Sequence, residues 1–421
     1  MKKTIITLVL GMVSLACAAQ EVEQKVRTSL YGYVRNEFFY DTRQSLTSGA
    51  GLLYFLPLDK NENILGEDLN AQAASRFLSM ESRIGLRIAG IDTWGAKISA
   101  NLEGDFDGFS ISGGNFTSNT VLRLRQAWTK AAWEHVEVVV GQTWHPMFGP
   151  VFPSVLGVSA GAPFNPLNRS PQLRVDYKHK NLRVYGAALY QMQYLSVGPR
   201  GSSPEYVRDN ILPELYAGLD YSPQSFVVGA GASTIGLRPR IIGEKQITVN
   251  EERVAIPVKV SDHVTSYAAQ AFAQYKAEKL TVKAKALYGQ NMAHLLQLSG
   301  YGISAKLADG SYEYSNLNTG TWWFNATYGK TYQVGIFTGF SKNYGSSKPL
   351  LEKPYTFGPN NLAHLFRLCP QFLYTYNSWH IGMEYEVTQA AYGTFSLAKG
   401  RVTDTHNVIN HRIFAEIVYN F

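Results

Sequence analysis

The side chains best suited to binding chemistry in this sequence are arginines and carboxylates that recur at alternate positions within short segments. In an extended strand alternate residues point to the same face, so Arg123 and Arg125 present their charges together. Guanidinium groups bind carboxylates and other oxyanions, often through two hydrogen bonds at once. We therefore predict a basic ladder on one face of neighbouring strands. The candidate site residues are Arg35, Glu37, Arg83, Arg87, Glu103, Asp105, Arg123, Arg125, Arg169, Arg174 and Arg183.

The acidic residues beside this ladder leave two interpretations open. Glu81 and Asp107 add to the carboxylates among the candidates. Charges of both signs on facing walls would create a transverse field for a passing ion. Alternatively, each arginine is solvated and neutralised in an ion pair. A cluster of this size biases ions even without a dedicated site, so we favour a selectivity role for the set as a whole.

The sequence gives little sign of catalysis or of metal binding. Its nine histidines are scattered without a ligand spacing supported by carboxylate or cysteine. His145, which precedes Pro146, is interpreted as part of a structural turn. We therefore predict no enzyme activity and no cofactor. A barrel enzyme with a catalytic group at its rim stays an alternative, because catalytic partners need not be adjacent in sequence.

The composition favours a transmembrane barrel over a helical membrane protein. Of 421 residues, 45% are hydrophobic, 13% aromatic and only 17% charged. A mean hydropathy of −0.14 argues against a helical bundle, and a soluble protein of this size usually carries more surface charge. The outer wall of a barrel faces lipid and needs little charge. The positive charges form no basic tail, so nucleic acid is not a predicted partner.

Strand-like alternation of apolar and polar residues recurs along the whole chain. Segments of about ten residues suit strands that cross a bilayer at a tilt. We count about sixteen segments and predict an all-β, antiparallel transmembrane barrel with short periplasmic turns and long extracellular loops. A soluble two-layer sandwich would alternate too, but aromatic residues at the segment ends favour the barrel. The segments begin near Ser29, Phe77, Thr93, Thr120, His135, Pro171, Asn181, Leu212, Ser225, Thr265, Lys279, Thr321, Thr331, His364, Trp379 and Asn410.

The two ends of the chain carry export signals. Residues 1–19 are predicted to be a signal peptide, with Lys2 and Lys3 before an apolar run and cleavage after Ala19. A lipoprotein acylated at Cys17 is the alternative. Residues 20–28 form a short N-terminal segment and 29–421 one barrel domain. The terminal strand ends in Phe421, which is typical of the signal that barrel-insertion machinery recognises.

Five motifs in order resemble the DcaP-like trimeric outer-membrane porins. They lie within Ser82–Arg87, Leu102–Phe106, Leu122–Ala127, Gly141–Trp144 and Asn168–Arg174, and the match is densest over Leu30–Tyr177. The resemblance implies a sixteen-stranded homotrimer in the outer membrane of a Gram-negative bacterium that favours small anions, dicarboxylates among them. Members can carry an N-terminal coiled coil, but here only about ten residues separate the predicted cleavage site from the first predicted strand.

The predicted function is therefore an outer-membrane porin, a water-filled path for small hydrophilic solutes that prefers anions such as dicarboxylates. Its partners would be these solutes, the membrane lipid and two further copies. The proline-rich loop Met147–Ser170 either packs on the rim or folds inward as a constriction with Arg169 at its base. A channel for hydrophobic solutes and a secreted β-rich binding protein without a channel are the remaining alternatives.

Overall fold

The structure is a computed structural model, and it describes residues 26–108, 121–157 and 161–421. The predicted signal peptide and Cys17 lie outside the described residues. Within the described part of the chain, no helix is long and apolar enough to span a membrane. Nearly all regular structure there is β-strand.

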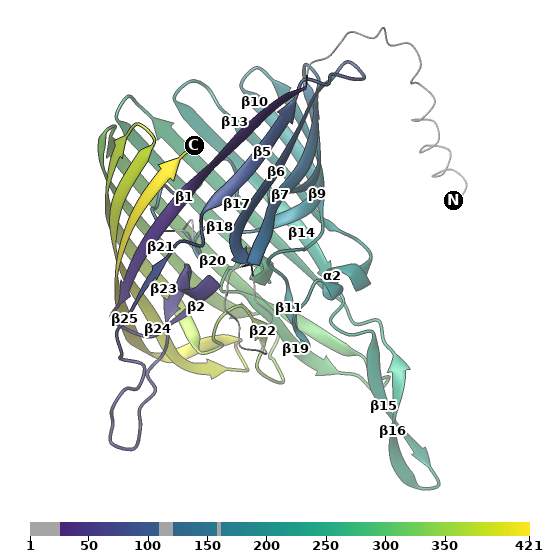
Figure 1. Cartoon of the computed structure of the whole chain (residues 1–421). Coiled ribbons are helices and arrows are strands. Elements are labelled where there is room, and N and C mark those ends of the chain that lie inside the picture. Colours follow the sequence, from purple (N-terminus) through teal and green to yellow (C-terminus); the bar gives the residue numbers. More distant parts are fainter. Residues whose placement is uncertain (1–25, 109–120, 158–160) are drawn as a thin grey trace.

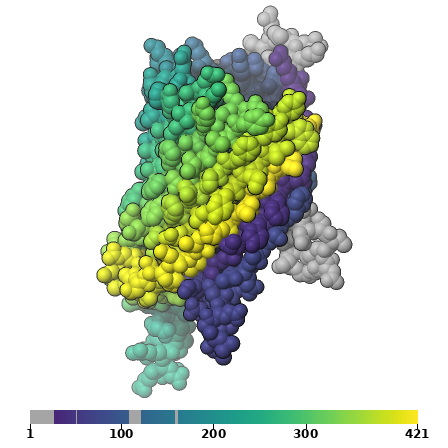
Figure 2. Space-filling view, turned by 90° about the vertical axis from the view of Figure 1, so that its left-hand side faces the viewer, coloured from purple at the N-terminus to yellow at the C-terminus, as the bar shows by residue number. Residues whose placement is uncertain are grey.

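Sixteen antiparallel strands close into one barrel (Figure 1). The first and last strands pair along 33–41 and 412–420, and Figure 2 shows them side by side, purple against yellow, on the outer wall. The barrel strands are β1 (Arg27–Asp41), β4 (Ala74–Leu78) continued by β5 (Arg83–Ala89), β6 (Lys97–Gly108), β7 (Val121–Ala132), β8 (Val136–Trp144), β9 (Arg169–His179), β10 (Leu182–Leu189), β13 (Glu214–Tyr221), β14 (Phe226–Leu237), β17 (Val264–Lys276), β18 (Leu280–Gln290), β20 (Tyr312–Gly329), β21 (Tyr332–Ser346), β23 (Leu362–Tyr376), β24 (Trp379–Ser396) and β25 (Arg401–Asn420).

The predicted segments coincide with these strands, with two differences in where a strand begins. β20 begins at Tyr312 and not near Thr321, and β25 begins at Arg401 and not near Asn410. Alternation marks only the part of a strand that separates lipid from lumen. In β25 it begins at residue 408, whereas residues 401–407 extend beyond it with no buried face.

The outer wall is apolar and the lumen is polar. In β25, Ile413 and Ile417 are 41% and 47% exposed, while Arg412 and Glu416, on the opposite face, are 1% and 7% exposed. Such a strand has its apolar side outward, which a lipid-facing barrel requires. A soluble sandwich would bury those isoleucines, so the arrangement excludes that alternative.

The two ends of the barrel differ as predicted. At one end short turns such as 133–135, 180–181 and 330–331 join the strands, and the C-terminus lies at this end (Figure 1). Long connections leave the other end, among them a projecting hairpin of β15 (Ile242–Val249) and β16 (Glu252–Lys259). Short turns face the periplasm in barrels of this type. The remaining elements of the connections are β2 (Ser45–Ser48), η1 (Gly49–Gly51), β3 (Leu53–Pro57), β11 (Val197–Gly198), β12 (Gly201–Ser202), α2 (Glu205–Asn210), η2 (Ala293–Leu295), β19 (Gly300–Lys306) and β22 (Tyr355–Thr356).

Three connections fold back into the barrel and pack together, and we call them the inner loops: residues 45–57, the described residues of 145–168 (145–157 and 161–168) and 291–299. Their apolar side chains, such as Leu56, Phe164 and Leu296, form one buried cluster with wall residues Trp323 and Phe337. The connection between β8 and β9 therefore folds inward and does not pack on the outer rim. Arg169 and Ser170, expected at the end of that loop, belong to β9.

Candidate functional site

A cavity of about 490 Å³ lies in the lumen between the barrel wall and loop 145–168. One side is basic and comes from strands β1, β5, β7 and β9. The other side is apolar and comes mainly from Leu53, Phe148, Phe152, Val155 and Leu156 of the inner loops. Five of the predicted site residues line it: Arg35, Arg83, Arg123, Arg125 and Arg169.

Arg123 and Arg125 are held by acids on the neighbouring strand. Arg123 faces Asp105 across β6 and β7 and donates two hydrogen bonds to it, at 2.9 and 2.7 Å. The register then shifts, so that Glu103 faces Gln126 and Arg125 has no partner residue opposite it. Such a β-bulge turns two successive side chains to one face. Arg125 consequently reaches both Glu103, at 2.8 Å, and Asp105, at 2.6 Å.

Arg35 and Arg83 extend the basic face onto β1 and β5. Arg35 pairs with Glu37 at 2.8 Å and with Glu416 at 2.6 Å, and it donates to the carbonyl of Leu156 in loop 145–168. Arg83 pairs with Glu81 at 2.9 Å. Glu81 lies between β4 and β5, where the second barrel strand is interrupted.

In two of these ion pairs the two signs of charge lie at different depths from the cavity. The side chain of Asp105 is fully buried, whereas that of Arg123 keeps 16% of its surface exposed. Glu37 and Arg35 show the same order, at 0% and 12%. In these two pairs the guanidinium group is the more exposed partner. Arg125 and Glu103 are equally buried, at 4% and 5%, and the carboxylates Glu81 and Asp107 also line the cavity. Four of the five arginines are compensated in ion pairs, as the second interpretation of the sequence anticipated.

Arg169 differs from the other arginines of the cavity. It is buried, and its Nε donates to the amide oxygen of Gln193 at 2.5 Å. It faces Trp144 directly across β8 and β9, and its guanidinium lies 4.8 Å from the indole ring centre. Among the described residues, no carboxylate lies within ion-pair distance of it. Arg169 is thus a cation on an aromatic platform without a fixed counter-ion.

The other predicted arginines lie elsewhere in the lumen. Arg174 pairs with Asp176 at 3.1 Å, and Arg183 pairs with Asp220. These two arginines line a smaller cavity of about 160 Å³. Arg87 is exposed and stacks on Tyr31 at 4.2 Å, near the periplasmic end of β5. The structure therefore does not bring the eleven predicted residues into one site.

Residues that the sequence reasoning missed fasten loop 145–168 to the opposite wall. Lys285 donates to the carbonyls of Met147, at 3.2 Å, and Phe148, at 2.6 Å. Arg367 donates to the carbonyl of Ala162 at 3.1 Å and also holds the backbone of loop 45–57 at Phe55, at 2.9 Å. Parity places Lys285 on the polar face of β18, which was the available signal. Nothing in the sequence indicated that a loop would cover it.

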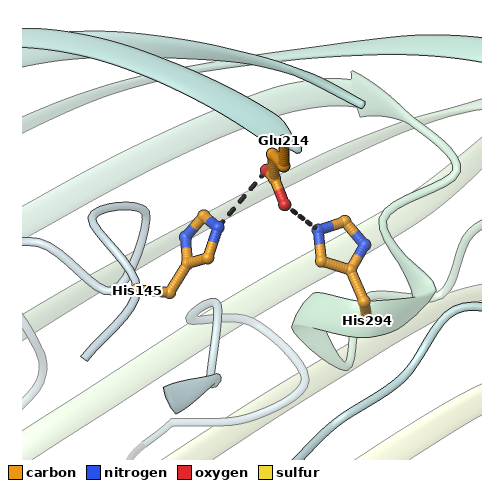
Figure 3. A group of neighbouring side chains, drawn as sticks. All are labelled: His145, Glu214 and His294. Carbon is orange, nitrogen blue, oxygen red and sulfur yellow. Dashed lines mark ion pairs between the residues drawn. The ribbon is translucent and has the colours of Figure 1, made fainter. Parts of the chain in front are cut away.

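Two histidines and a glutamate from distant segments converge beside loop 145–168 (Figure 3). Glu214 begins β13, and its carboxylate lies 3.3 Å from Nε2 of His145 and 3.0 Å from Nε2 of His294. All three side chains are buried. We call them the His–Glu–His cluster. His145 is thus more than the turn residue that the sequence suggested.

The donor types of this cluster fit a transition metal, but its hydrogen bonding does not. The backbone N–H of Met147 donates to Nδ1 of His145 at 3.1 Å. Nδ1 therefore carries no proton and Nε2 does, which leaves Nε2 without a lone pair for a metal. The arrangement suits a carboxylate held between two imidazole groups. Cys369, Glu384 and Glu386 also lie together, but Glu384 accepts from the N–H of Leu156.

Comparisons with known proteins place this geometry within one fold. No protein-family model matches the chain, and no curated protein sequence matches it. The crystal structure of the outer membrane channel DcaP of Acinetobacter baumannii matches with a TM-score of 0.67 at 17% identity, covering 96% of this chain and 100% of that one. The trimer form of OmpT of Vibrio cholerae matches with 0.53 at 12% identity, covering 94% and 99%. An anion-selective porin from Comamonas acidovorans matches with 0.52 at 10% identity, covering 94% and 100%.

At these identities the likeness establishes the fold. The chain is a sixteen-stranded outer-membrane β-barrel of the porin type. The predicted fold class is confirmed, and the predicted resemblance to the DcaP-like porins is confirmed as a likeness of structure. The apolar outer wall and closed sheet agree with the predicted outer-membrane location.

Proposed function

We propose that the protein forms a water-filled channel that lets small hydrophilic solutes diffuse across the outer membrane and prefers anions, carboxylates and dicarboxylates among them. The observation that carries this proposal is the 490 Å³ cavity, which is lined by five arginines and by only two carboxylates, Glu81 and Asp107. A solute in the cavity therefore meets an excess of positive charge. Arg169, which lines the same cavity, is the arginine there without a carboxylate partner among the described residues.

The expected preference is moderate, because four of the five cavity arginines are already compensated. Selectivity in such a pore arises from the charges that a partly desolvated ion touches at the narrowest point. A net advantage of about 1 kcal/mol for anions corresponds to a permeability ratio of about five. The apolar opposite wall offers cations no compensating ligand.

We also propose a homotrimer that contacts its copies through the apolar barrel walls and is inserted with the help of Phe421. Its likeness to the trimer form of OmpT supports this oligomeric state. Mass measurement in mild detergent tests it, and a purely monomeric species would contradict it. No catalytic step is part of the proposal.

The first test is the zero-current potential of the purified protein in a planar bilayer under a KCl gradient. We expect chloride to be favoured, and Arg169→Gln to reduce the permeability ratio clearly. Arg87→Gln is the matched control, because it removes the same charge outside the cavity. Absence of conductance from folded protein, or a cation preference, would contradict the proposal.

A further inference from the structure

A second polar cavity, of about 390 Å³, opens at the periplasmic end of the lumen. It lies where β17, β18, β20 and β21 end, and the turns 277–279 and 330–331 form part of its wall. Polar side chains dominate its lining, including Gln274, Lys276, Lys279, Lys283, Lys330 and Gln333. It shares no lining residue with the arginine-lined cavity.

Positive charge in this second cavity is largely uncompensated. Four lysines line it, with Glu278 as its one lining carboxylate. Glu278 is engaged with Lys330, at 2.9 Å. Lys276, Lys279 and Lys283 have no carboxylate within ion-pair distance among the described residues. The arginines of the first cavity, by contrast, each pair with an acid, Arg169 excepted.

A short stretch of loop 145–168 separates the two cavities. Phe152 and Pro153 line the arginine-lined cavity, while the next residue, Ser154, lines the second one. The Nζ of Lys283 donates to the hydroxyl of Ser154 at 2.7 Å and lies 5.3 Å from the ring centre of Phe152. Lys283 therefore stands at the partition, within reach of a solute that passes the edge of the loop.

The partition itself is fixed in place. The backbone N–H of Ser154 donates to Asn325 at 2.8 Å, and its carbonyl accepts from Gln371 at 2.7 Å. Because the backbone at Ser154 is held on both sides, the position of Lys283 relative to the two cavities is defined. Arginines therefore line the cavity on one side of residues 152–154, and lysines line the cavity on the other side.

We propose that Lys276, Lys279 and Lys283 form a second anion-binding site, at which small carboxylates dwell on the periplasmic side of the constriction. This inference rests on the proposed anion channel and adds a second binding site to it. Lysine ammonium groups are mobile point charges that accept oxyanions of varied shape. Conduction through a series of sites requires binding that is favourable and still releases the ion. A lysine site without fixed geometry can bind the anion and still release it at the periplasmic end of the channel.

The experiment uses the purified full-length barrel in an oriented planar bilayer, with succinate as the probe. Succinate is added to one chamber at a time, and its association rate is taken from the interruptions of the KCl current. The test variant is the triple Lys276→Gln, Lys279→Gln, Lys283→Gln. The control triple Lys245→Gln, Lys259→Gln, Lys353→Gln removes the same charge from exposed positions in the extracellular connections.

We expect the test variant to lower the association rate from the periplasmic chamber by about tenfold, as loss of electrostatic attraction does. The rate from the extracellular chamber and both rates of the control should stay within about twofold of the unmodified protein. Unchanged periplasmic association in a variant that still prefers chloride would overturn the second site and leave the channel proposal intact. An unmodified protein without anion preference would overturn both. Should the triple variant fail to fold, Lys283→Gln alone is expected to lower the same rate, and an unaltered rate would refute the site.

Discussion

At the scale of single residues, the charge of the first cavity depends on which half of each ion pair faces water. Asp105 is buried behind Arg123, so its negative charge is present but covered, whereas Arg125 and Glu103 are buried alike. Parity in the sequence placed both arginines on one face of a strand. It did not predict the bulge that brings Arg125 and Gln126 to the lumen together, because strict alternation places successive residues on opposite faces.

Removing the two central arginines should therefore reverse the ion preference and not merely abolish it. In Arg123→Gln, Arg125→Gln the carboxylates of Glu103, Asp105 and Asp107 lose their arginine partners and leave the cavity with an excess of negative charge on this wall. We expect the zero-current potential to change sign toward cations. Replacing Arg174 and Arg183, which line the smaller cavity, removes the same charge and should shift it far less. Equal shifts for both pairs would show that only total charge matters.

The His–Glu–His cluster makes a separate prediction about stability. Glu214→Gln removes the charge that His145 and His294 face, and breaking a buried charged contact costs about 3 kcal/mol. We expect a lower unfolding midpoint in urea. Glu278→Gln at the exposed Lys330 pair should cost less than about 1 kcal/mol. A chelator should leave the unfolding of the unmodified protein unchanged, and a chelator-sensitive midpoint would contradict the hydrogen-bond assignment at His145.

At the scale of elements, the sequence predicted the strands well and the inner loops poorly. The strands can be recognised in the sequence because one face contacts lipid and the other contacts water, so apolar and polar residues alternate with a period of two. Leu52–Pro57 is an apolar run without a partner in that scheme, so its burial inside the lumen had no signature. The His–Glu–His cluster was likewise invisible, since its members come from β13 and from two loops far apart in sequence.

The connection from Leu58 to Ala73 provides an element-scale prediction about pH. The Arg43 guanidinium donates to Asp68 at 2.6 Å and lowers the pKa of that carboxyl to about 2. A depressed carboxyl pKa stabilises the folded connection above the unfolded value and loses this effect as pH falls toward the folded value. Protection of Leu65 and Leu69 from pepsin should thus persist near pH 4 and disappear near pH 2.

Asp68→Asn serves as the comparison for this test. It keeps the shape of the side chain but removes the titrating group, so pepsin should already cleave the connection near pH 4. Cleavage of unmodified protein and variant at the same pH would contradict a role for the Arg43–Asp68 pair. The connection lies outside the strands, so cleavage there leaves the barrel available as an internal reference for folding.

At the scale of the whole molecule, the barrel closes where its first and last strands, β1 and β25, pair. The backbone of Phe421 exchanges two hydrogen bonds with Gly32, at 3.1 and 3.2 Å. A Cβ atom on Gly32 would meet the carbonyl of Arg83 at 2.2 Å and the ring of Phe421 at 2.8 Å. Phe421, which is predicted to direct insertion, is therefore also part of the seam, by which we mean the junction between the first and last strands.

Gly32→Val should consequently impair assembly of the barrel. We expect the amount of the folded, heat-modifiable form in outer-membrane fractions to fall by roughly tenfold. The added side chain would clash with backbone atoms of the neighbouring strand, which cannot move aside as a flexible side chain can. Gly186→Ala is the matched control, because a Cβ there meets only Tyr216 backbone at an ordinary 3.6 Å. Normal amounts of folded Gly32→Val would show that the seam tolerates separation at this end.

The inner loops have a consequence for the field inside the barrel. They replace water with hydrocarbon along one side of the first cavity, through Phe148, Phe152 and Leu156. A wall of low polarisability concentrates field lines from the arginines into the remaining water. Apolar residues thereby strengthen the attraction of anions without contributing any charge. Phe152→Ser should then weaken the preference for chloride even as it widens the path. Anion selectivity in this molecule thus depends on the apolar wall of the cavity as well as on its arginines.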